Sequence, residues 1–119
     1  MKYMACFDMD GTLIEIKSSW EFIHEILGTE REAYIYRQMY ERGEIDYRKW
    51  AELDVSSWKK RDFSEVLRRV DSIKLMENSE KSIKMLKDHG FIVGVISSGL
   101  NVIADKVCER LGMDFCKSA

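Results

Sequence analysis

Apolar residues along the 119-residue chain follow two periods. Residues 3–8 (YMACFD) and 91–96 (FIVGVI) are short apolar runs that end within one strand length, which predicts buried β-strands. Apolar positions three and four residues apart predict helices elsewhere, over about 18–28, 30–42, 46–58, 62–70, 78–90 and 101–112. A third strand is predicted to begin at about residue 113.

The order of these elements predicts an α/β fold. A strand, a helix, a strand, a helix and a strand are typical of a partial doubly wound parallel (Rossmann-like) sheet. The helices before residue 74 interrupt this order after the first strand and are short of β signals. We therefore expect an incomplete α/β core from residues 1–14 and 74–119, with an inserted all-helical module, or cap, over residues 15–73.

Composition narrows the class of protein. The chain is 45% hydrophobic and 34% charged, which is typical of a folded domain, and its net charge of −2 gives no electrostatic reason to expect nucleic acid or membrane as a partner. No apolar stretch approaches the roughly 18 residues of a membrane span. The three cysteines are odd in number and lack a C-x-x-C spacing, so we interpret them as reduced thiols of a cytoplasmic protein.

Polar residues follow two of the predicted strands where each strand ends. Residues 8–12 read DMDGT and residues 97–101 read SSGLN. The carboxyl ends of parallel strands meet at one edge of a sheet, so Asp8 and Asp10 could share a pocket with the hydroxyl of Ser97. A divalent cation between carboxylate and phosphate would offset the repulsion of the two acids. The alternatives are an acidic turn that only ends a strand, and a serine that only caps a helix.

These residues resemble two motifs of the haloacid dehalogenase-like (HAD) superfamily of phosphotransferases. The strand followed by DMDGT is similar to the first motif of that family, and VISSG at residues 95–99 is similar to the second. The helical insertion resembles the cap of the phosphoserine phosphatase-like branch. The resemblance covers essentially the whole chain and implies a Mg²⁺-dependent phosphatase acting through an aspartyl-phosphate.

The resemblance also implies a role for each residue. Asp8 would be the nucleophile and a magnesium ligand. Asp10 would be the general acid and then the general base, and its backbone carbonyl would bind magnesium. Asp8 must then start ionised and Asp10 protonated. The phosphate-binding residues would be Thr12, Ser97, Ser98 and Gly99.

Two parts of the family pattern are missing. The third motif, a lysine, and the fourth, an acidic pair, lie farther along the chain in the family, and Lys106 and Lys117 do not stand at the expected place. Strand 3–8 would then be an uncovered sheet edge. We therefore expect a piece of a longer enzyme, or a lobe completed by a second chain. The alternative function is a catalytically inactive interaction module derived from this family.

The insertion carries the candidate specificity residues. Lys17 stands where phosphoserine phosphatases have a glutamate, and Asp54 stands near the position of an arginine. Both charges are the reverse of what phosphoserine requires, so we expect another small phosphorylated metabolite as substrate. Trp20 follows the first motif closely and could face the site, whereas His24 is expected on the surface of the insertion.

Overall fold

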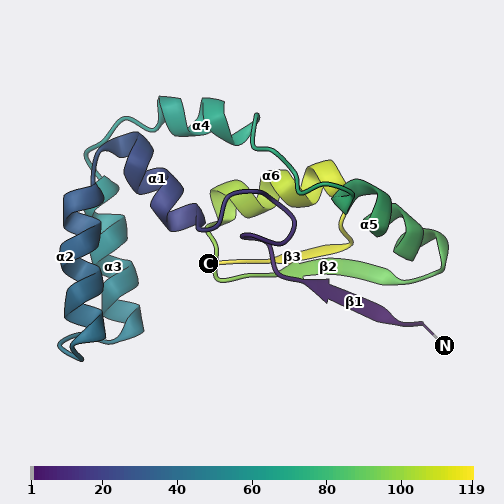
Figure 1. Cartoon of the computed structure of the whole chain (residues 1–119), viewed down its shortest axis with the longest axis horizontal. Helices are drawn as coiled ribbons and strands as arrows, with labels where there is room; N and C mark the ends of the chain where they lie inside the picture. Colours follow the sequence, from purple (N-terminus) through teal and green to yellow (C-terminus); the bar gives the residue numbers. More distant parts are fainter. Residues whose placement is uncertain (1) are drawn as a thin grey trace. The chain divides into compact units, whose positions relative to one another are not determined.

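The computed structural model describes residues 2–119 and confirms an α/β fold (Figure 1). Within these residues, no helix combines the length and the apolar character that a membrane span requires. The elements in chain order are β1 (Met4–Phe7), α1 (Ser19–Leu27), α2 (Glu30–Glu41), α3 (Tyr47–Trp58), α4 (Ser64–Val70), α5 (Ser79–Asp88), β2 (Ile92–Ile96), α6 (Asn101–Leu111) and β3 (Phe115–Lys117).

The three strands form one parallel sheet in the order β1-β2-β3. Helices α5 and α6 provide the connections into β2 and out of it, and Figure 1 shows both on the same face of the sheet. Right-handed crossovers through strands in sequential order place their helices on one face in this way. Val93 and Val95 of β2 are fully buried, as expected for a strand covered by helices. The predicted α/β fold, a parallel sheet with inserted helices, is therefore confirmed.

Strand β1 ends the sheet, as predicted, and the sheet is poorly covered there. Met4 of β1 is 62% exposed, and Ile96 of β2 is 57% exposed. Met4 is paired with Ile92 of β2. Ile92 and Ile96 are four residues apart, so the side chains of Met4 and Ile96 lie on the same face of the sheet. Residues 2–119 therefore leave apolar side chains and the edge of β1 open to solvent.

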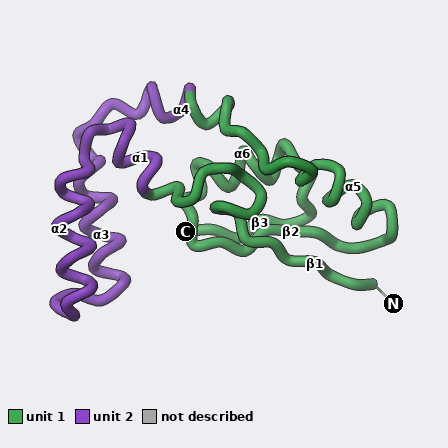
Figure 2. The backbone as a smooth tube through the Cα atoms, in the orientation of Figure 1, with its two compact units in different colours: residues 1–20, 69–119 green, residues 21–68 purple. Residues whose placement is uncertain are grey.

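The contacts divide the chain into two units (Figure 2). Unit 1 comprises residues 1–20 and 69–119 and contains the sheet, whereas unit 2 comprises residues 21–68. The sequence placed these boundaries at 14/15 and 73/74. Residues 15–20 fall in unit 1 because Ser19 bonds to Asp10 at the end of β1. In unit 2, α2 packs against α3, where the rings of Tyr40 and Trp50 stack with their centroids 4.6 Å apart.

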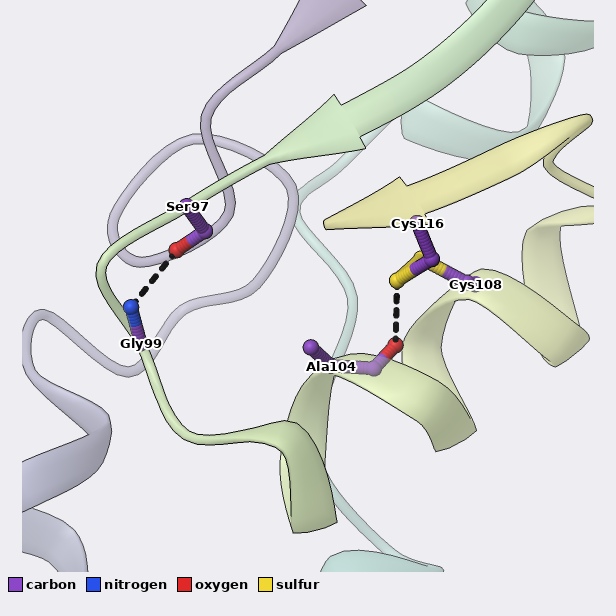
Figure 3. The surroundings of a disulfide bond; sticks show 5 residues. All are labelled: Ser97, Gly99, Ala104, Cys108 and Cys116. Atoms are coloured by element: carbon purple, nitrogen blue, oxygen red, sulfur yellow. Dashed lines mark hydrogen bonds between the residues drawn. A yellow bond between two sulfur atoms is a disulfide. The ribbon is translucent and has the colours of Figure 1, made fainter. Parts of the chain in front are cut away.

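The expected state of the cysteines was wrong for two of the three. Cys108 and Cys116 form a disulfide that joins α6 to β3, and Cys6 is free and exposed (Figure 3). The left-handed Gly112 at the end of α6 (φ 64°) turns the chain back along the helix into β3. This turn brings the two Cα atoms to 6.4 Å, within the range that a disulfide spans. A search for C-x-x-C spacing could not find a pair that only this turn brings together.

Peptide mapping tests the disulfide directly. Trypsin cleaves after Lys106, Arg110 and Lys117, so the two half-cystines fall in different peptides, 107–110 and 111–117. We expect mass spectrometry of the unreduced protein to find these peptides joined, and reduction to release both. Cys6 should be alkylated without reduction and serves as the internal control. Alkylation of Cys108 and Cys116 in the unreduced protein would contradict the pairing.

Candidate active site

Unit 1 brings the two polar segments predicted from the sequence to one place. The last residue pair between β1 and β2 is Phe7 with Val95, so the segments that follow the two strands leave the sheet side by side. The packing beyond the strands is close. A Cβ added to Gly99 would lie 2.7 Å from the Met9 Cε and 3.1 Å from the Ser97 Oγ. The segment after β2 therefore lies directly against the segment after β1, and a side chain at position 99 would require these neighbours to shift.

The two acids after β1 differ in their surroundings. Asp8 is exposed, and its Oδ1 accepts a hydrogen bond from the Met9 N–H at 2.8 Å. Asp10 is half-buried, and its Oδ2 accepts bonds from the Ser19 N–H at 2.8 Å and the Ser19 hydroxyl at 2.9 Å. The Asp10 Oδ1 is buried and has no hydrogen-bond partner among residues 2–119.

These surroundings shift the pKa of the Asp10 carboxyl. Burial raises the pKa of the Asp10 carboxyl above its ordinary value, and the nearby charge of Asp8 adds to the rise. The two hydrogen bonds from Ser19 lower this pKa but do not cancel the effect of burial. A raised pKa favours the protonated form, which is the form that a general acid needs at the start of a reaction.

Hydrogen bonds hold the segment after β2 in a compact loop. The Ser97 N–H donates to the Lys117 carbonyl at 2.9 Å, and the Ala119 N–H donates to the Gly99 carbonyl at 2.9 Å. The Gly99 N–H, expected to bind phosphate, donates in this structure to the Ser97 Oγ at 2.9 Å (Figure 3). Because this oxygen accepts from Gly99, its own hydroxyl proton can point elsewhere. Ser98 is exposed on the same loop.

A tight turn places Thr12 and Lys17 beside Asp10. The Gly11 N–H donates to the Ile16 carbonyl at 2.8 Å, and Gly11 adopts a left-handed conformation (φ 71°) that favours glycine. The Thr12 N–H donates to the Met9 carbonyl at 3.1 Å, and both Thr12 and Lys17 are exposed. The side chain of Lys17 therefore belongs to the same loop as the acids.

Trp20 and Asp54 have partners in the protein. The indole N–H of Trp20 donates to the Ser98 carbonyl at 3.1 Å, which attaches the start of α1 to the loop after β2. Asp54 is in unit 2, where it is 6% exposed. The prediction that either residue contacts substrate stays a prediction, and the structure gives each a bond within its own unit.

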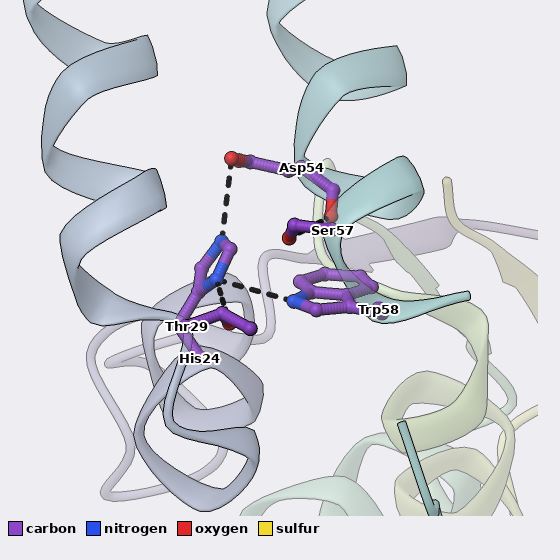
Figure 4. A network of polar contacts seen from close by, with 5 residues as sticks. All are labelled: His24, Thr29, Asp54, Ser57 and Trp58. Atoms are coloured by element: carbon purple, nitrogen blue, oxygen red, sulfur yellow. Dashed lines mark hydrogen bonds and ion pairs between the residues drawn. The ribbon is translucent and has the colours of Figure 1, made fainter. Parts of the chain in front are cut away.

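Asp54 belongs to a buried polar cluster of unit 2 (Figure 4). Its Oδ1 lies 3.3 Å from the His24 Nε2, a charge contact that is not an aligned hydrogen bond. On the other side of the ring, the His24 Nδ1 lies 2.7 Å from the Thr29 Oγ1 and 3.1 Å from the Trp58 Nε1. The expectation that His24 lies on the surface was wrong, because it is 3% exposed.

The donors in this cluster assign the proton of the His24 ring. An indole N–H can only donate, so the Trp58 Nε1–H requires an unprotonated Nδ1 on His24. The ring proton then lies on Nε2, facing the Asp54 carboxylate. No sequence pattern predicted this cluster, because apolar periodicity does not report which polar residues pair inside a helical unit.

The residues present fit part of a magnesium site. Magnesium in phosphate-handling proteins takes one or two carboxylates and keeps waters and substrate oxygens as its other ligands. The exposed carboxylate of Asp8 suits such a site, and the backbone carbonyl of Asp10 would be the second protein ligand. Across residues 2–119, no group of three or more acidic, histidine or cysteine side chains is placed to hold a metal ion.

The fold and the paired strand ends define a protein class. The chain belongs to the haloacid dehalogenase-like hydrolase family, whose model matches residues 4–119. It is 29% identical over 114 residues to a phosphoserine phosphatase from Methanocaldococcus jannaschii and 36% identical over 116 residues to one from Archaeoglobus fulgidus. These matches cover 96% of the chain but only 54% and 33% of the two relatives.

A solved structure is similar over the same region. It is described as a phospho-aspartyl intermediate analogue of phosphoserine phosphatase, and it superposes with a TM-score of 0.79 at 27% identity. The superposition covers 98% of this chain and 56% of that one. The chain thus spans about half the length of this neighbour, with the sheet and the inserted helices in common.

Proposed function

We propose that the protein is a Mg²⁺-dependent phosphatase that hydrolyses a small phosphomonoester through an aspartyl-phosphate on Asp8. The observation that carries the proposal is the meeting of Asp8, Asp10 and Ser97 at neighbouring strand ends of unit 1. The similarity to phosphoserine phosphatases supports the same reaction class.

The first step transfers the phosphoryl group to the protein. The Asp8 Oδ1 already accepts the Met9 N–H, so Oδ2 is the oxygen that attacks phosphorus. A bond forms between Oδ2 and phosphorus while the bond from phosphorus to the leaving oxygen breaks. The proton on the Asp10 Oδ1 passes to the leaving oxygen, which departs as an alcohol. In the second step, Asp10 takes a proton from water as that water attacks phosphorus, and Asp8 is released.

The loop after β2 holds the phosphoryl oxygens. The Ser97 Oγ accepts the Gly99 N–H, so its hydroxyl proton can be donated to a phosphoryl oxygen. The hydroxyls of Ser98, on the same loop, and of Thr12, on the loop after β1, are exposed and would be further donors. A bound magnesium ion would neutralise charge on the phosphate and on Asp8.

Phosphate release from p-nitrophenyl phosphate tests this function. We expect turnover by the full-length protein with Mg²⁺, and loss of at least about 95% of it when EDTA removes the metal. Readdition of Mg²⁺ should restore the rate, which separates metal removal from irreversible unfolding. A well-folded protein that releases no phosphate with Mg²⁺ would favour the alternative, an inactive interaction module.

We also propose that a segment beyond residue 119 covers the edge of β1. Exposed Met4 and Ile96 beside an unpaired strand edge support a missing cover, and the match to only about half of the relatives supports its source. Amides of β1 should exchange with solvent at least about tenfold more slowly in the full-length protein than in residues 1–119. Equal exchange in both would favour a second chain as the cover.

The positive charge of Lys17 supports the proposal that the substrate is not phosphoserine. The backbone of Lys17 lies against Gly11, next to Asp10 in the chain, so its ammonium group would repel the positively charged amine of phosphoserine. We expect Lys17→Glu to raise kcat/KM for phosphoserine, relative to p-nitrophenyl phosphate, by about tenfold. Lys84→Glu, an exposed charge reversal on α5, is the control and should leave the ratio unchanged. Wild-type protein that prefers phosphoserine in a phosphate-ester panel would contradict this proposal.

A cytoplasmic location remains part of the proposal, and the disulfide gives it a test. Disulfides are rare in reducing compartments. If the protein is cytoplasmic, alkylation of thiols in intact cells before lysis should find Cys108 and Cys116 mostly reduced. A cysteine pair that is protected from alkylation in cells would place the protein in an oxidising compartment.

A further inference from the structure

Ser19 joins the two segments of the candidate site through one hydroxyl group. It is the first residue of α1 and is fully buried. Its hydroxyl donates to the Asp10 Oδ2 at 2.9 Å, and its oxygen accepts the Leu100 N–H at 3.2 Å. Asp10 follows β1 and lies nine positions before Ser19, and Leu100 follows β2 and lies 81 positions after it. The Ser19 hydroxyl therefore links the two loops of the site.

The chemistry of the three bonds determines their direction. The Leu100 N–H can only donate, so it uses a lone pair of the Ser19 oxygen. The single hydroxyl proton of Ser19 is then left for the Asp10 Oδ2, which also accepts the Ser19 N–H. An oxygen that accepts two bonds is not the protonated one, so the carboxyl proton belongs on Oδ1.

Packing reinforces this link. A Cβ at position 99 would lie 2.8 Å from the Ser19 Oγ, so the loop after β2 approaches Ser19 as closely as a glycine allows. The next residue, Trp20, donates its indole N–H to the Ser98 carbonyl at 3.1 Å. Ser19 and Trp20, at the start of α1, therefore bond to Leu100 and Ser98 of the segment that contains Ser97.

We propose that Ser19 is a positioning residue for the reaction: its hydroxyl orients the Asp10 carboxyl for proton donation from Oδ1 and holds the Ser97 loop in register with it. This inference rests on the proposed function. Ser19 acts through its bonds to Asp10 and Leu100.

The test compares substrates whose leaving groups differ in their need for a proton. Departure of p-nitrophenolate needs little protonation, whereas an alkoxide such as that of ethyl phosphate needs a proton from Asp10. In the full-length protein, we expect Ser19→Ala to lower kcat/KM for ethyl phosphate about tenfold more than for p-nitrophenyl phosphate. Ser19→Thr keeps the hydroxyl and should recover most of both rates.

Ser79→Ala is the matched control. Ser79 is a buried serine of unit 1, 7% exposed, whose hydroxyl has no hydrogen-bond partner among the described residues. This variant removes a similar buried hydroxyl and should change neither rate by more than about threefold. If Ser19→Ala lowers both rates equally, or matches Ser79→Ala, the positioning role is wrong.

Hydrogen exchange separates this inference from the proposed function. We expect the Leu100 amide to exchange at least about tenfold faster in Ser19→Ala than in Ser79→Ala or wild type, because its acceptor is removed. Unchanged exchange would overturn the link between Ser19 and the loop, whatever the activity. If wild type releases no phosphate while exchange responds as expected, the proposed function fails and the link stands.

Discussion

Replacing Asp8 with asparagine is expected to lower phosphate release by at least about a thousandfold. An amide is a far weaker nucleophile than a carboxylate, and it also removes the negative charge that would attract magnesium. The change is nearly isosteric, and Asp8 is exposed and accepts a hydrogen bond from the Met9 N–H. The variant should therefore fold normally, so that the loss reports the chemistry.

Two measurements make this result specific. Acid quench of wild-type protein with labelled substrate should trap label on a peptide that contains residue 8, and Asp8→Asn should trap none. Asp71→Asn is the matched control, because Asp71 is also exposed in unit 1 and pairs only at 3.9 Å with Lys106. Its rate should stay within about twofold of wild type. An Asp8→Asn variant that keeps a tenth of the activity would contradict the nucleophilic role.

The second large effect is on stability. Replacing Asp54 with alanine is expected to lower the free energy of unfolding by about 2 to 3 kcal/mol. The change removes the buried carboxylate that lies 3.3 Å from the His24 Nε2, and with it a charge contact inside the helical unit. Urea unfolding followed by circular dichroism measures the loss. Asp71→Ala, which breaks only a surface ion pair, should cost less than about 1 kcal/mol.

A double-mutant cycle separates the pair from the loss of volume. Replacing both His24 and Asp54 with alanine should cost at least about 1 kcal/mol less than the sum of the single changes, because no buried partner is then left unsatisfied. Additive costs would mean that His24 and Asp54 contribute only by packing. Because Asp54 lies in unit 2 and is buried, this measurement is independent of the phosphatase assay.

The part of the site that lies at the strand ends could be predicted from local sequence. Asp8 and Asp10 follow an apolar run, and Ser97 follows another, so the parallel arrangement could be predicted before any coordinates. The register that pairs Phe7 with Val95 puts the two segments at the same edge. These features depend on neighbouring residues and on the regular geometry of parallel sheets.

Long-range pairing could not be predicted in the same way. No sequence pattern assigned Ser19 a part in the site, His24 was expected on the surface, and Cys108 and Cys116 were expected as reduced thiols. Ser19 and His24 gain their roles from partners distant in sequence, Leu100 and Asp54, and the cysteines are brought together by the turn through Gly112. Hydrophobic periodicity records which face of a helix is buried but not which polar group meets another there.

The order of strands and helices, the position of the acids at a strand end and the family resemblance follow from residues close together in the chain. They follow because backbone geometry repeats over a few residues and leaves a period in the sequence. Which oxygen of Asp10 is left without a partner, and which side chains hold the loop after β2, follow only from the folded chain. Those contacts depend on atoms brought together by packing, and no local pattern encodes them.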